Sequence, residues 1–172
     1  MRTRRSRPAP TSPSTQSPLT DLRMPVQAKL AAAWASFMFL YIYVDILAFY
    51  KPGVVDDILA GVVWEFDITQ TWAITALTLL AIPILMVVLS MTLPARANRI
   101  TNLIVASVQV PFAAFNAVGE VGEPWMYFYV LGVSLEIIVL AFILYSAWAW
   151  PRRTASPATL ATGLHREPFR VR

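Results

Sequence analysis

The chain has 172 residues, of which 57% are hydrophobic and 14% are charged, and its formal net charge is +4. Soluble domains carry roughly 25% charged residues, so this composition argues against a soluble fold. The basic residues flank apolar segments and form no separate basic domain, which argues against nucleic-acid binding.

The absence of cysteine excludes disulfides and thiolate metal sites. The single histidine, His165, lies in the polar C-terminal part, so we expect no histidine ligand or proton relay within the membrane. We therefore expect no metal and no cofactor.

The first part of the chain, residues 1–28, is basic and rich in proline, serine and threonine, a composition typical of disorder. A secretory signal would carry a short apolar core of roughly 7–15 residues before a small-residue cleavage site. The first apolar run begins near Leu30 and lasts about twenty residues, so we interpret it as a retained membrane helix.

Four apolar segments follow in chain order, and each is long enough to cross roughly 30 Å of hydrocarbon at about 1.5 Å per residue. They are predicted at about 30–50, 71–93, 100–118 and 125–150. Residues 54–64 are too short to span and predict a short helix at the membrane interface. The predicted fold class is an all-α membrane protein with four transmembrane helices in residues 29–151, followed by a disordered basic tail, residues 152–172.

Charge is distributed asymmetrically about these segments. Thirteen of the fourteen Lys and Arg residues lie on one side, and Lys51 alone lies on the other. The connections on the side of Lys51 carry the acids Asp56, Asp57, Glu65, Asp67, Glu120 and Glu123. Because Lys and Arg are retained on the cytoplasmic side, the pattern predicts that both termini are cytoplasmic.

The six tryptophans fall near the predicted ends of the apolar segments, which is typical of interfacial aromatic belts. Those at the inner boundary are Trp34, Trp148 and Trp150, and those at the outer boundary are Trp64, Trp72 and Trp125.

Two carboxylates lie within the predicted spans. Glu136 is about 16 Å along its helix from Trp125, near the bilayer centre, and Asp45 is roughly 8 Å from the outer boundary. A charge at the centre of a membrane helix costs on the order of 2.5–3.5 kcal/mol. We therefore expect both side chains to face the bundle, to form hydrogen bonds or to be protonated.

Other polar residues of the spans recur at helical spacing, so each helix has one polar face. These faces are Tyr41 and Asp45; Thr71, Thr75 and Thr78; Asn102, Gln109 and Asn116; and Tyr129, Gly132 and Glu136. We predict that they meet inside the bundle, where Glu136, Gln109 and Tyr41 form a buried polar cluster with Asp45 on its outer side. Asn102, Asn116 and Tyr129 are secondary candidates. The alternative is that these polar groups serve only as contacts between helices.

Several segments resemble a family of small four-helix bacterial membrane proteins known only as a domain of unknown function. The resemblance covers residues 30–151 and rests on the run from Trp34 to Asp45, on residues 81–90, on Arg96-Ala-Asn-Arg99 with its flanks, and on Glu136 in a helix that ends Ala147-Trp-Ala-Trp150. It implies a four-span bundle in a bacterial inner membrane, and it implies no activity.

Three classes of function remain open. The first is a small transporter, or a subunit of one, that uses Asp45 and Glu136 for protons or a cation. The second is a non-catalytic protein that binds lipid or a protein partner, including another copy of itself. The third, an intramembrane enzyme, is disfavoured because the chain has no cysteine, no histidine in a span and no recognisable catalytic motif.

Overall fold

The computed structural model describes residues 24–151, which form four long helices, one short helix and a small hairpin. The predicted disorder of the two tails concerns mainly residues 1–23 and 152–172, which lie outside the described part. The long helices are α1 (Val26–Ala48), α3 (Gln70–Thr92), α4 (Ala95–Val118) and α5 (Met126–Trp148). Each is long and apolar enough to cross a membrane, so the predicted four-helix membrane fold is confirmed.

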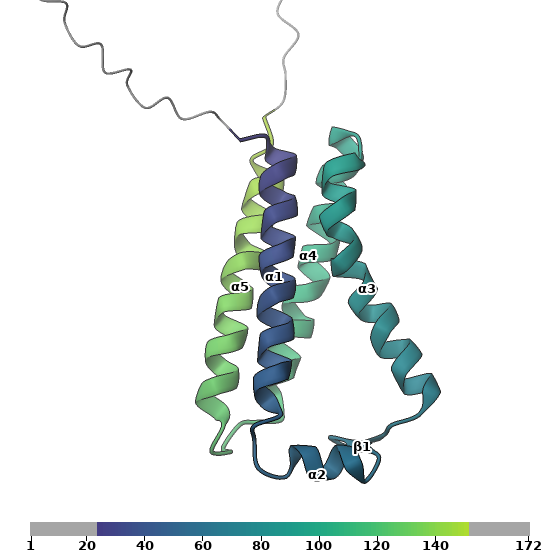
Figure 1. The fold of residues 1–172 in the computed structure, drawn as a ribbon. Helices are drawn as coiled ribbons and strands as arrows, with labels where there is room; N and C mark the ends of the chain where they lie inside the picture. The colour runs from purple at the N-terminus through teal and green to yellow at the C-terminus, as the bar shows by residue number, and fades with distance from the viewer. Residues whose placement is uncertain (1–23, 152–172) are drawn as a thin grey trace, which may run out of the picture.

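The four helices run alternately up and down, so that α1 begins and α5 ends at the same end of the bundle (Figure 1). We call this the basic end, because Arg96 and Arg99 also lie there, in the first turns of α4. The opposite, acidic end carries the connections from α1 to α3 and from α4 to α5. Helix α5 packs on both α1 and α4, and α1 also packs on α3.

The turn between α3 and α4 is shorter than predicted. The ring of Pro94 confines the preceding Leu93 to an extended conformation, with ψ 146°, so α3 ends at Thr92. Helix α4 then begins at Ala95, about five residues before the predicted start. Asn98, which the sequence placed in a connection, is therefore part of the helix.

Helix α3 changes direction near its middle, and its acidic-end half leans away from the other three helices (Figure 1). Pro83 lies inside the helix at this level. It has no N–H to donate to the carbonyl of Leu79, and its ring crowds the preceding turn, which accounts for the bend.

The acidic-end connection differs from the single short helix predicted for residues 54–64. Helix α2 (Val54–Leu59) ends after six residues, and an antiparallel pair follows, β1 (Val62–Val63) with β2 (Phe66–Asp67). Gly61 and Trp64 both have positive φ, 86° and 56°, which an α-helix cannot contain. Trp64 forms the tight hairpin turn and packs on Phe115 of α4, with ring centroids 5.9 Å apart.

Candidate functional site

The core at the basic end contains a polar cluster that the sequence did not predict, formed by Trp34, Ser90, Asn98 and Asn102, all with no exposed surface. The indole Nε1 of Trp34 donates to Oδ1 of Asn102 at 2.7 Å. The Asn102 amide donates to Oδ1 of Asn98 at 2.6 Å, and the Asn98 amide donates to the Ser90 carbonyl at 2.6 Å.

This basic-end cluster ties α1, α3 and α4 together, and each of its amides has a partner. It is therefore well suited to holding helices, and nothing in it is left free to bind an ion or ligand. The prediction that Trp34 belongs to an interfacial belt is wrong, because its ring is buried in the core. The spacing of Asn98 and Asn102, one helical turn apart, was the available signal for the cluster.

Glu136 has a different environment. Its exposed fraction is 2%, and its Oε2 atom has no hydrogen-bond partner among residues 24–151. The ion pair found in that part of the chain joins Lys51 to Glu120 at the acidic end, so no base among residues 24–151 is paired with Glu136. A buried carboxyl oxygen without a partner is costly, which makes Glu136 the strongest candidate for a functional group.

Two interhelical contacts fix the depth of Glu136 relative to Gln109. A Cβ added to Gly132 would lie 2.8 Å from Val44, so these two residues are at one level, and Glu136 is four residues, about 6 Å, further in. Tyr41 is three residues further in than Val44, and its ring stacks on that of Phe112 with the ring centroids 6.4 Å apart, so these two residues also share one level. Gln109 is three residues further still, so it lies about 9 Å below Val44, within about 3 Å of the depth of Glu136.

The structure thus places Gln109 and Glu136 at similar depths, both buried, on the packed helices α4 and α5. Tyr41 is half-buried and lies nearer the acidic end than Gln109. Asp45 lies one turn beyond Tyr41 toward the acidic end, and it is exposed.

The secondary candidates are divided between two places. Asn116 and Tyr129 are half-buried toward the acidic end, whereas Asn102 belongs to the separate basic-end cluster.

The prediction that the threonine face points into the bundle is wrong: Thr71, Thr75 and Thr78 are all exposed. The hydroxyls of Thr75 and Thr78 donate to carbonyls of their own helix, at 2.9 and 2.7 Å, and so need no interhelical partner.

Lys51 closes the acidic end of α1 against the connection that precedes α5. Its ammonium donates to both carboxylate oxygens of Glu120, at 2.8 and 2.7 Å, and lies 5.9 Å from the ring centroid of Tyr129. The hydrogen bond to Glu120 raises the pKa of Lys51, so the lysine stays charged at any physiological pH. The sequence marked Lys51 as the one base on the acidic side but did not identify its partner.

The candidate site contains no group of three or more metal-ligating side chains within residues 24–151. What it offers is a buried carboxyl on α5 and a buried amide at similar depth on α4, with a second carboxylate nearer the acidic end. This arrangement can bind and release a proton or a small cation.

Comparison with known proteins supports the resemblance noted in the sequence. The sequence model of a family of unknown function, DUF6326, matches residues 23–156. No curated protein and no solved structure matches the chain.

Proposed function

We propose that this chain, which belongs to the DUF6326 family of unknown function, is a small proton- or cation-linked transporter or a subunit of one. In this proposal Glu136 binds and releases the ion, Asp45 relays it on the outer side, and Gln109 and Tyr41 orient the carboxyl. The observation that carries the proposal is the buried Oε2 of Glu136, which has no partner among the described residues.

The energetic argument is that an unpaired acid at mid-membrane depth is costly to keep. Polar contacts between membrane helices contribute only about 0.6 kcal/mol on average, whereas the acid costs on the order of 2.5–3.5 kcal/mol. A carboxyl that served only to join helices would gain more from a partner like those of the basic-end cluster. Within residues 24–151, Oε2 of Glu136 has no such partner, and this favours a transient ligand.

We further propose that the protein lies in the bacterial inner membrane with both termini in the cytoplasm. Support comes from the thirteen Lys and Arg residues on one side of the spans. The basic end of the bundle then faces the cytoplasm, and the acidic end, with the short helix and hairpin, faces outward. We do not expect an enzymatic activity.

The test is cation-driven proton movement in liposomes. The purified full-length protein is reconstituted with a pH-sensitive dye inside, and gradients of Na⁺, K⁺ or tetraphenylphosphonium are imposed one at a time. We expect proton movement with at least one cation and its loss in Glu136→Gln. Ser134→Ala is the matched control, because Ser134 lies on the same helix, is exposed and bonds the carbonyl of Val130 at 2.6 Å.

Two results would overturn this proposal. One is the absence of proton movement with every cation in the wild type. The other is movement that persists in Glu136→Gln at the rate of Ser134→Ala.

A second candidate function, binding of lipid or a protein partner without transport, is favoured by a groove of 440 Å³ between α1 and α5. Small residues open this groove near the basic end, and its lining includes Lys29, Ala32, Ser36 and Phe142. Co-purification of a stoichiometric partner or lipid that is lost in Ala32→Leu, with no cation-driven proton movement, would favour this function over transport.

A further inference from the structure

Asp45 is exposed, yet it lies on the face of α1 that is directed toward α4. Tyr41, one turn earlier on the same face, stacks on Phe112 of α4. Asp45 therefore also points toward the α4 side, yet its side chain is exposed. A carboxylate exposed to lipid would be costly at this depth, so the exposure indicates an opening among the helices that water can enter.

The divergence of α3 accounts for the opening. At mid-depth a groove of 260 Å³ separates α3 from α4, and its lining includes Leu79, Ile82, Gln109 and Phe112. Toward the acidic end α3 leans further from the other helices (Figure 1). The lining also includes the buried Gln109's inward neighbours Ile104 and Val105, so the groove passes Gln109, which lies at nearly the depth of Glu136.

Polar residues lie on the same helix faces as the groove lining, nearer the acidic end. Thr75 and Thr78 share one face of α3 with Ile82, because they precede it by seven and four residues. Asn116 shares one face of α4 with Gln109, seven residues before it. The exposed threonines, which line no interhelical core, are therefore placed where they would line the opening together with Asn116 and Asp45.

Toward the acidic end, the seam between α1 and α5 offers no comparable route. Val44 fills the space at Gly132 so closely that an added Cβ would lie 2.8 Å from it. Outward of this contact, Lys51 and Glu120 close the seam over the ring of Tyr129. Access to Glu136 from the acidic end therefore runs between α1, α3 and α4.

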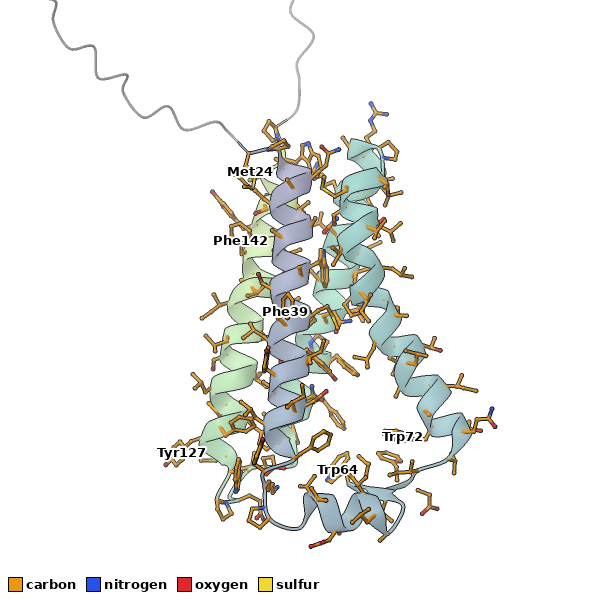
Figure 2. All side chains as sticks on the ribbon, viewed as in Figure 1. Met24, Phe39, Trp64, Trp72, Tyr127 and Phe142 are labelled. Atoms are coloured by element: carbon orange, nitrogen blue, oxygen red, sulfur yellow. The ribbon has the colours of Figure 1, made fainter. Side chains whose placement is uncertain are left out.

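The mouth of this opening is electronegative. The acidic end carries six acids in its two connections, and the one base there, Lys51, is already paired with Glu120. Trp64 on the hairpin and Trp72 on α3 also lie at this end (Figure 2). A mouth lined by one sign of charge concentrates ions of the opposite sign, so the ligand it favours is a cation.

We propose that α1, α3 and α4 enclose a hydrated vestibule open at the acidic end, through which a cation reaches Asp45 and then the Gln109–Glu136 pair. The inference rests on the proposed role of Glu136 as the ion-binding group. It adds the side from which that group is reached, the helices that line the route and the charge of the ligand.

The chain contains no cysteine, so a single introduced thiol is the only one in the protein. Asp45→Cys is compared with Leu47→Cys, whose parent side chain is also exposed but is turned about 200° away, toward lipid. The reagent is a membrane-impermeant, cationic methanethiosulfonate applied to full-length protein in sealed vesicles of known orientation. A thiol in water ionises and reacts, whereas a thiol in lipid does not.

We expect Asp45→Cys to react at least about tenfold faster than Leu47→Cys from the acidic side, although Leu47 lies nearer to that surface. Equal rates, or reaction of Asp45→Cys only from the basic side, would overturn the vestibule. A second pair on α3, Thr78→Cys against the lipid-facing Leu77→Cys, gives the same comparison if the Asp45 variant does not fold.

The labelling result is independent of transport. Fast labelling of Asp45→Cys without cation-driven proton movement would leave the vestibule standing and remove the proposed function. Proton movement with slow labelling at both Asp45→Cys and Thr78→Cys would support the proposed function and overturn the vestibule.

Discussion

Replacing Asn102 by alanine tests whether the basic-end cluster holds α1, α3 and α4 together. The change removes the acceptor of the Trp34 indole N–H and the donor to Oδ1 of Asn98, bonds of 2.7 and 2.6 Å. Both groups then remain buried without these partners, since Trp34 and Asn98 have no exposed surface.

The expected loss follows from those two groups. Each buried polar group left unsatisfied costs about 1–3 kcal/mol, while polar contacts between membrane helices average about 0.6 kcal/mol. For the two groups together, the average membrane contact gives a lower limit of about 1 kcal/mol, and the cost of an unsatisfied buried group gives an upper limit of about 6 kcal/mol. We expect Asn102→Ala to lower the free energy of unfolding by about 2–3 kcal/mol, because both lost bonds are short and fully buried.

The assay is reversible unfolding of purified protein in mixed micelles as the fraction of denaturing detergent rises. Ser90→Ala is the matched comparison within the cluster, because the Ser90 hydroxyl makes only long contacts to Asn102, at 3.3 and 3.4 Å. We expect it to cost less than about 1 kcal/mol. The reasoning fails if Asn102→Ala costs no more than Ser90→Ala, or if it costs no more than Ser107→Ala on the exposed face of α4.

Two further predictions concern the α1–α5 seam. Gly132→Val should destabilise the bundle by about 1–3 kcal/mol, because the added Cβ would lie 2.8 Å from Val44. Adding Val44→Ala should restore part of the lost stability. A Gly132→Val protein with the melting temperature of the wild type would contradict this contact. Lys51→Gln should cost about 0.2–1 kcal/mol through loss of the ion pair to Glu120. Because the pKa of Lys51 is raised, the pair's contribution is fully present below about pH 10.4, the usual lysine value, and is lost as pH rises through the raised value. The difference in melting temperature between wild type and Lys51→Gln should therefore stay constant from pH 6 to 9, and a difference that already disappears within that range would contradict the pairing.

The number of spans and their approximate positions followed from the sequence because they depend on local properties. A run of about twenty apolar residues spans a bilayer whatever its neighbours are, and Pro94 ends a helix by its own covalent geometry. The concentration of Lys and Arg on one side is likewise visible along the chain. The same local reasoning identified Glu136 and Gln109 as polar residues at similar depths.

Tertiary structure decided which polar faces meet. Periodicity shows that Thr71, Thr75 and Thr78 share a face, but only packing shows that this face is exposed while Pro83 and Met86 are buried. Trp34 lies at a position typical of an interfacial tryptophan, but it is buried, and its indole N–H donates to Asn102, 68 residues away. The hydrogen bonds a side chain makes across helices depend on rotations and distances that no single segment specifies.

The sequence by itself therefore determined that this protein has four membrane-spanning helices, with acidic residues within two of them, because hydropathy and helix length are properties of each segment. Only the tertiary structure decided that Asn102 is hydrogen-bonded to both Trp34 and Asn98. It also decided that Oε2 of Glu136 has no partner among residues 24–151 and that Asp45 is exposed. These differences arise because the energy of a buried polar group depends on what surrounds it, and its surroundings come from other helices.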